Sequence, residues 1–436
     1  MPAILMHFLH TLYRHALALA HRLLGTDIRF FAKNAVFVST GYATAVLRGI
    51  VTGYLVARLF PRELYGQYQF ILSAVGAVGA FGLPGITNAL SRAVARGERE
   101  AILPVARVQF LAAIVGSILL LAAIPFLPAE RQALWPLFLL AALLFPVSQA
   151  AGTIFASITV GMERFSYALK ANVISNAAIV LAALLILLIY PSPALLIAVT
   201  MAFPALVSLN FSRPLVLRPS PAVSVKPILR YGLQLTLANL PISLSWYVDK
   251  LMISALFGLN QLAVFSVAIL LPEQSKVLAK ELLPVLFAVQ SRGADSPERR
   301  RRLLFVTLRA TLLFFTGIIG YILLAPWIFA LLFPNYPEAV WLTRIAALTL
   351  VTLPSGILTQ YLEAQAMIRA LQWTRWISTA VFLISLLTLI PTYGLIGAIL
   401  ARGLLRLSYA ACSIIFMLRA PPVPGGSQTI PSAELP

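Results

Sequence analysis

Residues 270–287 read LLPEQSKVLAKELLPVLF and place four ionisable side chains inside an apolar run: Glu273, Lys276, Lys280 and Glu281. A charge at the middle of a bilayer costs about 2.5–3.5 kcal/mol on insertion scales, so such residues normally face protein or a water-filled cavity. At 100° per residue, the first three fall within about 60° of one another on a helix, with Glu281 roughly 80° further round. The run therefore predicts a membrane helix with a polar stripe turned away from lipid.

Further ionisable side chains lie within other apolar runs: Arg48, Asp249, Lys250, Arg309, Glu363, Arg402 and Arg406. Histidine-based or metal-dependent catalysis is not expected, because every histidine lies within the first 21 residues and the aspartates, at 27, 249 and 295, are far apart. The single cysteine excludes a disulfide framework. We therefore expect a protein that is not an enzyme and that has no metal site and no cofactor.

The composition is that of an integral membrane protein. Hydrophobic residues make up 60% of the chain and charged residues 11%, with a mean hydropathy of +0.91, whereas soluble domains carry about 25% charged residues. The apolar runs predict about twelve transmembrane helices. They lie at 34–57, 65–89, 105–127, 133–158, 171–190, 193–211, 231–257, 262–290, 303–333, 339–364, 373–391 and 393–418.

The basic residues predict the orientation. With the N-terminus inside, about 22 Lys and Arg residues fall on inner segments, and only Arg58, Arg62, Arg131 and Arg344 fall outside, so both termini are predicted to be cytoplasmic. The net charge of +19 is then a topology signal, and we expect no nucleic-acid partner. The run ERRRRL at 298–303 fits the same explanation, with contact to lipid head groups as an alternative.

The two halves of the chain repeat each other in hydropathy. Residues 33–60 align with 230–257 at an offset of 197 residues, and because six spans separate them, both halves enter the membrane in the same direction. We expect an all-α integral membrane fold with two parallel six-helix lobes around a central cleft. The expected parts are a cytoplasmic amphipathic segment (1–32), an N-lobe (33–212), a cytoplasmic linker (213–230), a C-lobe (231–419) and a disordered tail (420–436).

Two stretches resemble a known family. ARLFPRELYGQYQF (57–70), followed by GAFGLPGITNALSRAVARGE (79–98), resembles the first two spans of the Wzx-type polysaccharide flippases, and SWYVDKLMISALFGLNQLAVFSVA (245–268) resembles the start of their second half. These flippases belong to the multidrug/oligosaccharidyl-lipid/polysaccharide (MOP) exporter superfamily. The resemblance implies a multi-pass protein of the bacterial inner membrane that flips an undecaprenyl-pyrophosphate-linked oligosaccharide to the periplasmic leaflet by alternating access, for cell-surface polysaccharide biosynthesis.

In this superfamily spans 1, 2, 7 and 8 line the central cleft, so the resemblance gives the buried charges a role. Our hypothesis is a cationic pyrophosphate site formed by Arg48, Lys250, Lys276 and Lys280, because two adjacent phosphates need more than one cation. A simple pair between Glu273 and Lys276, three residues apart, is the alternative. The acids Asp249, Glu273, Glu281 and Glu363 are candidates for coupling or gating. Arg402 and Arg406, one turn apart, are expected to bind head groups or to brace the lobe.

Two other functions compete with the flippase. A drug or organic-cation antiporter of the same superfamily would use the buried acids, against which the excess of cations argues weakly. A membrane glycan polymerase or ligase is disfavoured by the missing catalytic histidines and by short outer loops. We expect a monomer in the lipid bilayer whose partners are the lipid-linked oligosaccharide, a coupling ion (H⁺ or Na⁺) and, as a further candidate, the polysaccharide polymerase machinery.

Overall fold

The computed structural model describes residues 28–216, 224–280, 296–365 and 367–419. Within these residues every regular element is a helix. The segment predicted to be amphipathic, most of the inter-lobe linker, Glu281 and the C-terminal tail lie outside the described residues. The side chains of Lys276 and Lys280 also lie outside them.

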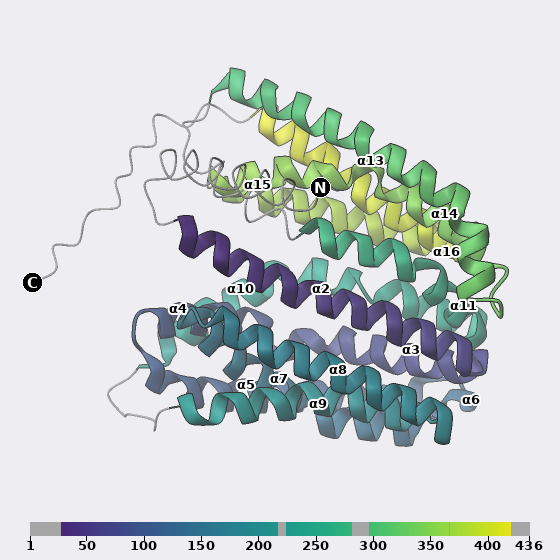
Figure 1. Cartoon of the computed structure of the whole chain (residues 1–436), viewed down its shortest axis with the longest axis horizontal. Coiled ribbons are helices and arrows are strands. Elements are labelled where there is room, and N and C mark those ends of the chain that lie inside the picture. Colours follow the sequence, from purple (N-terminus) through teal and green to yellow (C-terminus); the bar gives the residue numbers. More distant parts are fainter. Residues whose placement is uncertain (1–27, 217–223, 281–295, 366, 420–436) are drawn as a thin grey trace, which may run out of the picture.

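The N-terminal half of the fold comprises the helices that occupy the lower part of Figure 1, together with α2 above them. Its long helices pack side by side, α5 against α7, α7 against α9 and α2 against α8. The elements are α2 (Ile28–Leu59), α3 (Arg62–Ala77), α4 (Pro84–Ala95), α5 (Ile102–Ala122), the short α6 (Ala129–Gln132), α7 (Trp135–Gly161), α8 (Phe165–Ile189) and α9 (Pro193–Ser212).

The C-terminal half lies mainly in the upper part of Figure 1, while α10 and α11 run along the middle of the molecule with α2. Its peripheral helix α13 packs on α14 and on the 3₁₀ turn η5. The elements are α10 (Lys226–Ser245), α11 (Val248–Lys280), α13 (Pro297–Leu332), α14 (Ala339–Leu348), η5 (Thr349–Ser355), α15 (Gly356–Ala364) and α16 (Ile368–Arg419).

The helices account for the predicted membrane spans. By length and apolarity, eight helices among the described residues are able to cross a membrane, or nine if the bent pair α3 and α4 is one span. Two further boundaries between spans lie at Gly258 (φ 87°) and Gly394 (φ 58°), glycines of positive φ that interrupt α11 and α16. With α2 added, and with α10 joined to the first part of α11, the described helices fall on all twelve predicted apolar runs.

Span 2 is broken in its middle. A 3₁₀ turn follows α3, Leu83 adopts a left-handed conformation (φ 48°), and a proline then starts α4 at an angle of 48°. Neighbouring helices satisfy the backbone groups that the break leaves unpaired, as hydrocarbon requires. The amide of Gln109 on α5 donates to the Gly82 carbonyl, and the Gly85 N–H donates to Thr236 Oγ1 on α10 at 3.0 Å.

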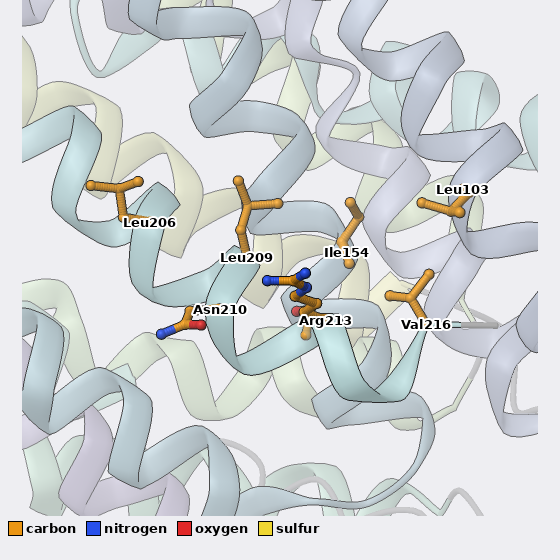
Figure 2. A pocket seen from close by; sticks show the side chains of 8 residues that line it. Leu103, Ile154, Leu206, Leu209, Asn210, Arg213 and Val216 are labelled. Carbon is orange, nitrogen blue, oxygen red and sulfur yellow. The ribbon is translucent and has the colours of Figure 1, made fainter. Parts of the chain in front are cut away.

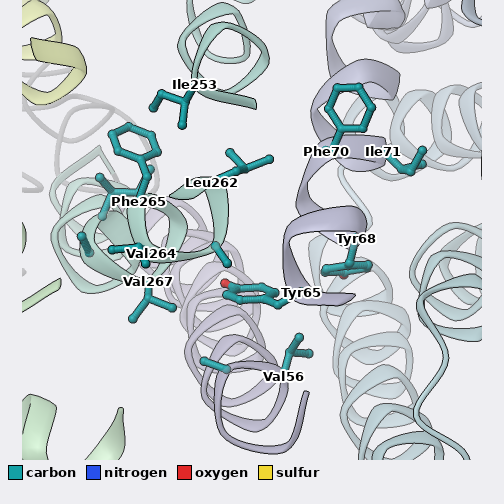
Figure 3. Close-up of a cluster of buried hydrophobic side chains, with 14 of the residues drawn as sticks. Val56, Tyr65, Tyr68, Phe70, Ile71, Ile253, Leu262, Val264, Phe265 and Val267 are labelled. Carbon is teal, nitrogen blue, oxygen red and sulfur yellow. The ribbon is translucent and has the colours of Figure 1, made fainter. Parts of the chain in front are cut away.

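The two halves share one hydrophobic core. Its cluster draws Val56, Tyr65 and Ile71 from the N-terminal half, and Ile253 and Phe265 from the C-terminal half (Figure 3). Span 2 lies along span 7, because α3 packs on α11 and α4 packs on α10.

Small residues allow span 2 to approach span 7 and the turn between spans 7 and 8. A Cβ atom at Gly66 would lie 2.1 Å from the Leu259 carbonyl oxygen, and one at Gly85 would lie 2.4 Å from the Gly232 oxygen. Backbone atoms are the neighbours in both cases, so a side chain at either position would separate the halves.

Candidate functional site

Span 7 breaks where its acidic residue lies. Helix α10 contains Pro241 and ends at Ser245, and α11 begins at Val248, so Asp249 falls in the first turn of a new helix within the membrane-spanning part of the chain. Its Oδ1 accepts the backbone N–H of Lys250 at 2.8 Å. A carboxylate in the first turn is stabilised by unpaired N–H groups and by the helix dipole. Asp249 is nevertheless completely buried, so it needs a further counter-charge.

Arg402 supplies that counter-charge from span 12. Its Nε donates to Asp249 Oδ2, and its Nη1 donates to Glu273 Oε1 on span 8 at 2.8 Å. The guanidinium carbon also lies 5.6 Å from the centre of the Phe265 ring. Arg402 is buried and therefore ties three spans together through two carboxylates.

Arg406, one turn along span 12, completes the arrangement. Its Nη2 donates to the same Glu273 oxygen, and its Nη1 donates to Thr349 Oγ1, where α14 ends. We call Asp249, Glu273, Arg402 and Arg406 the Asp249 network. Its two acids and two arginines carry a net charge of zero, and such pairing is what allows four charges to be buried together.

Two cations lie outside this neutral network. Lys250 reaches from span 7 to span 2, where its Nζ donates to Gln69 Oε1 at 3.3 Å. Arg48 on α2 is partly buried and lies near Tyr68 on α3. Among the residues that the structure describes, neither cation forms an ion pair with a carboxylate.

Span 8 approaches span 1 beside Arg48. A Cβ atom at Gly49 would lie 2.7 Å from Gln274 Nε2, next along the chain from the network residue Glu273. Polar residues of spans 7, 8 and 12, with Gln69 of span 2, are therefore linked through direct contacts at the junction of the two halves, and span 1 packs against span 8 beside them.

The remaining sequence candidates lie elsewhere or outside the described residues. Glu363 pairs with Arg375 at 3.5 Å, and Arg375 also donates to Asn239 Oδ1 at 3.1 Å, which forms a separate polar cluster. For Lys276, Lys280 and Glu281, the proposed roles stay predictions.

Sequence reasoning missed three partners, Gln69, Thr349 and Phe265. Gln69 alone carried a visible signal, as an amide within an apolar span. Sequence reasoning also assigned no acidic partner to Arg402 or Arg406. Their spacing of one helical turn does place the two guanidinium groups on one face of the helix.

A second contact between the halves lies at the predicted outer end. Arg62 Nε donates to the Asn335 carbonyl oxygen at 2.9 Å, and Arg62 Nη1 pairs with Glu338 Oε1 at 3.1 Å. Arg58 Nη1 donates to the Leu331 carbonyl oxygen at 3.3 Å. We call these interactions of Arg58 and Arg62 with residues 331–338 the outer contact.

The Tyr336 side chain packs against the outer contact. It is completely buried, its ring lies 5.2 Å from the Arg62 guanidinium carbon, and it meets Tyr65 edge to face. Burial raises the pKa of Tyr336 to about 12, so the phenol stays neutral at physiological pH. Burial also raises the pKa of the Glu338 carboxyl, but hydrogen bonds from its own backbone and from Arg62 outweigh burial and hold that pKa below the ordinary glutamate value.

Two surface grooves among the described residues lie away from the Asp249 network. The larger groove, of about 650 Å³, is on the N-terminal half, and Figure 2 shows the Arg213 side chain among its mainly apolar walls. Its lining residues are Leu103, Ile154, Leu206, Leu209, Asn210, Ser212, Arg213 and Val216. A smaller groove lies on α13. No group of three His, Cys, Asp or Glu side chains that could hold a metal occurs within the described part of the chain.

Comparison with known proteins bears on the family and on the fold. A family model described as "Polysaccharide biosynthesis protein" matches residues 31–271. No curated protein sequence matches the chain.

Solved structures share the fold at low sequence identity. The lipid II flippase MurJ in an inward closed conformation has a TM-score of 0.69 at 15% identity, over 89% of this chain and 87% of that chain. An outward-facing multidrug resistance MATE family transporter of the MOP superfamily has a TM-score of 0.62 at 18% identity, over 91% and 96%. A MOP superfamily transporter from Pyrococcus furiosus has a TM-score of 0.60 at 14% identity, over 91% and 96%. The predicted fold class and the resemblance to the MOP superfamily are confirmed.

Proposed function

We propose that this chain, which belongs to the polysaccharide biosynthesis protein family, carries an undecaprenyl-pyrophosphate-linked oligosaccharide from the cytoplasmic to the periplasmic leaflet of a bacterial inner membrane. The MOP transporter fold supports a transport function, and the family supports a glycan cargo. In the proposed cycle, the two halves open alternately to the two sides while the polyprenyl tail stays in the lipid.

The observation that carries the proposal is the charge left over at the junction of the halves. Arginine neutralises both acids of the Asp249 network, so Lys250 and Arg48 are the described cations there that have no carboxylate partner. An excess of positive charge on spans 1 and 7 suits a pyrophosphate better than it suits a cationic drug.

The hydrogen bond between Lys250 and Gln69 suggests how the cargo is received. A neutral amide is a weak partner for an ammonium group, whereas a phosphate oxygen makes a charge-assisted hydrogen bond of roughly twice the strength. In our proposal the pyrophosphate replaces Gln69 as the hydrogen-bond partner of Lys250. Because that bond joins span 7 to span 2, cargo binding would also weaken the contact between the two halves.

The Asp249 network is our candidate for coupling. Asp249 and Glu273 hold spans 7, 8 and 12 through shared arginines, so a proton or a sodium ion on either carboxylate would weaken the bonds between these spans. Glu363, paired with Arg375, is a second candidate for this role.

The acids give less support to the antiporter alternative. A site for organic cations needs a carboxylate that is open to the ligand, and Asp249, Glu273 and Glu363 each pair with an arginine. The enzyme alternative gains no support from the fold, because the matching structures are a flippase and transporters by their descriptions.

The leaflet location of the lipid-linked oligosaccharide tests the proposal. In cells depleted of the protein we expect the glycan to accumulate on the cytoplasmic side, and the wild type to restore export. Lys250→Gln and Arg48→Gln should fail to restore export at normal protein levels, whereas Lys170→Gln, an exposed cation on α8, should restore it fully. Normal glycan export in depleted cells would refute the flippase assignment. Full activity of both variants would refute only the cationic site.

A further inference from the structure

Helix α13 is longer than a membrane requires. It has 36 residues, which at 1.5 Å each span about 54 Å, against about 30 Å for the hydrocarbon core. Its first residues therefore extend beyond the hydrocarbon at the predicted inner end. Ser296 caps this end, because its side chain accepts the Arg299 N–H at 3.2 Å.

The arginines at the start of α13 point in two directions. Arg300 is buried and donates to the Met417 carbonyl oxygen at 2.8 Å, and Arg299 lies over the Tyr361 ring, so both turn toward the protein. Arg301 and Arg302 are exposed and turn away from it.

These two arginines belong to a groove that follows one face of the helix. The groove has a volume of about 480 Å³, and its lining residues recur at intervals of three and four along α13. We call it the α13 groove, and it is lined by Glu298, Arg301, Arg302, Phe305, Val306 and Arg309.

The α13 groove combines charge with apolar surface. The lining carries three guanidinium groups, of Arg301, Arg302 and Arg309, and one carboxylate. None of the three arginines forms an ion pair with a described acidic residue. Arg309 lies seven residues beyond Arg302, or about 10 Å deeper along the helix. Between them Phe305 and Val306 are 53% and 44% exposed, which leaves apolar surface beside the cations.

The groove opens toward lipid and not toward the other half. Only 17% of the apolar window of α13 is buried, the lowest value among the eight described helices able to span a membrane. Leu308, Leu312 and Leu313 continue this exposed surface, while the opposite side of α13 packs on α14 and η5. A ligand of the α13 groove would therefore come from the surrounding bilayer.

We propose that the α13 groove binds an anionic phospholipid of the inner leaflet. Arg302 and Arg309 would hold the phosphate through paired N–H donors, Arg301 would attract the rest of the head group, and Phe305 with Val306 would support an acyl chain. The excess of positive charge selects an anionic head group over a zwitterionic one. This inference is independent of the cargo, because the groove lies away from the Asp249 network.

Lipid binding by the purified full-length protein tests the inference. We would measure binding of phosphatidylglycerol and of phosphatidylcholine to the wild type and to the Arg302→Gln/Arg309→Gln variant by native mass spectrometry. Two arginines at a membrane surface contribute enough for about a 30-fold loss of phosphatidylglycerol affinity, with no change for phosphatidylcholine. The matched control is Arg99→Gln/Arg164→Gln, which removes two exposed cations from the N-terminal half and should bind as the wild type does.

Three results would overturn the inference. One is unchanged phosphatidylglycerol binding by the groove variant, and another is an equal loss in the control variant, which would indicate an effect of net charge alone. The third is a polyprenyl phosphate that displaces phosphatidylglycerol at much lower concentration, which would assign the groove to the cargo. If the double variant fails to fold, Arg309→Lys keeps the charge but removes the paired donors, and it should still lose several-fold affinity.

Discussion

Replacing Arg402 by glutamine should be among the most destabilising single changes in this protein. The substitution removes the donors of both Asp249 and Glu273 from span 12. Glu273 keeps Arg406 as an ion-pair partner, so it loses only part of its counter-charge. Asp249 keeps only the backbone N–H of Lys250 as a described donor and is completely buried, so its carboxylate is left without a described ion pair.

The magnitude follows from this arrangement. Removing one member of a buried ion pair costs about 3–5 kcal/mol, mainly because the remaining charge is uncompensated. Asp249→Asn should cost less, about 1–3 kcal/mol, because Arg402 keeps Glu273 as its partner. In the double variant the uncompensated carboxylate is gone, so the two losses should not add, and we expect a coupling energy of about 3 kcal/mol.

Unfolding in mixed detergent micelles, followed by tryptophan fluorescence, would measure the four proteins of this cycle. The reasoning fails if Arg402→Gln lies within about 1 kcal/mol of the wild type, or if the two single losses add within about 0.5 kcal/mol. Either result would mean that water or another group already compensates Asp249.

Three other changes probe the junction of the halves. Gly66→Ala should lower stability and yield, because its Cβ would lie 2.1 Å from the Leu259 carbonyl oxygen; thermal unfolding would measure the loss. Thr236→Val leaves a buried backbone N–H of α4 without an acceptor and should cost about 1–3 kcal/mol in unfolding free energy. Glu338→Gln should lose up to about 1 kcal/mol at pH 7, since its pair with Arg62 is exposed. Because the pKa of Glu338 is lowered in the folded protein, that contribution disappears as pH falls through it, so the two proteins should become equally stable in acid.

Each of these changes has a control. Gly79→Ala should be harmless, because no atom lies within 4 Å of the added methyl group. Thr236→Ser keeps the acceptor oxygen and should retain most of the stability. For the outer contact, a stability difference between the wild type and Glu338→Gln that persists at a pH below the lowered pKa of Glu338 would show that the ion pair is not its source.

Much of the fold could be predicted because it depends on local patterns. Apolar runs of about 20 residues define spans without reference to their neighbours. Span 2 breaks at Pro84, which lies close behind several glycines, so this break also depends on residues adjacent in the chain.

The pairing of charges could not be predicted in the same way. Asp249 and Arg402 are separated by 153 residues, and their contact depends on which helices become neighbours. Local reasoning offered Glu273 the partner three residues away, Lys276, whose side chain lies outside the described residues. It did not find Arg402 and Arg406, which the structure places on that carboxylate. Side-chain spacing reveals which residues share a helix face, but it does not reveal what lies opposite.

The outer contact has a consequence for how this protein tolerates change. Arg58 and Arg62 bind mainly carbonyl oxygens of the main chain, at Leu331 and Asn335, and these oxygens are present whatever side chain the position carries. Homologues could therefore vary at 331 and 335 and keep the bonds from both arginines, losing only the long hydrogen bond from Asn335 Nδ2 to the Arg58 carbonyl oxygen at 3.5 Å. A deletion or insertion of one residue between 331 and 335 would displace the carbonyls and abolish the contact. The length of this loop, and not its composition, should be the property under selection.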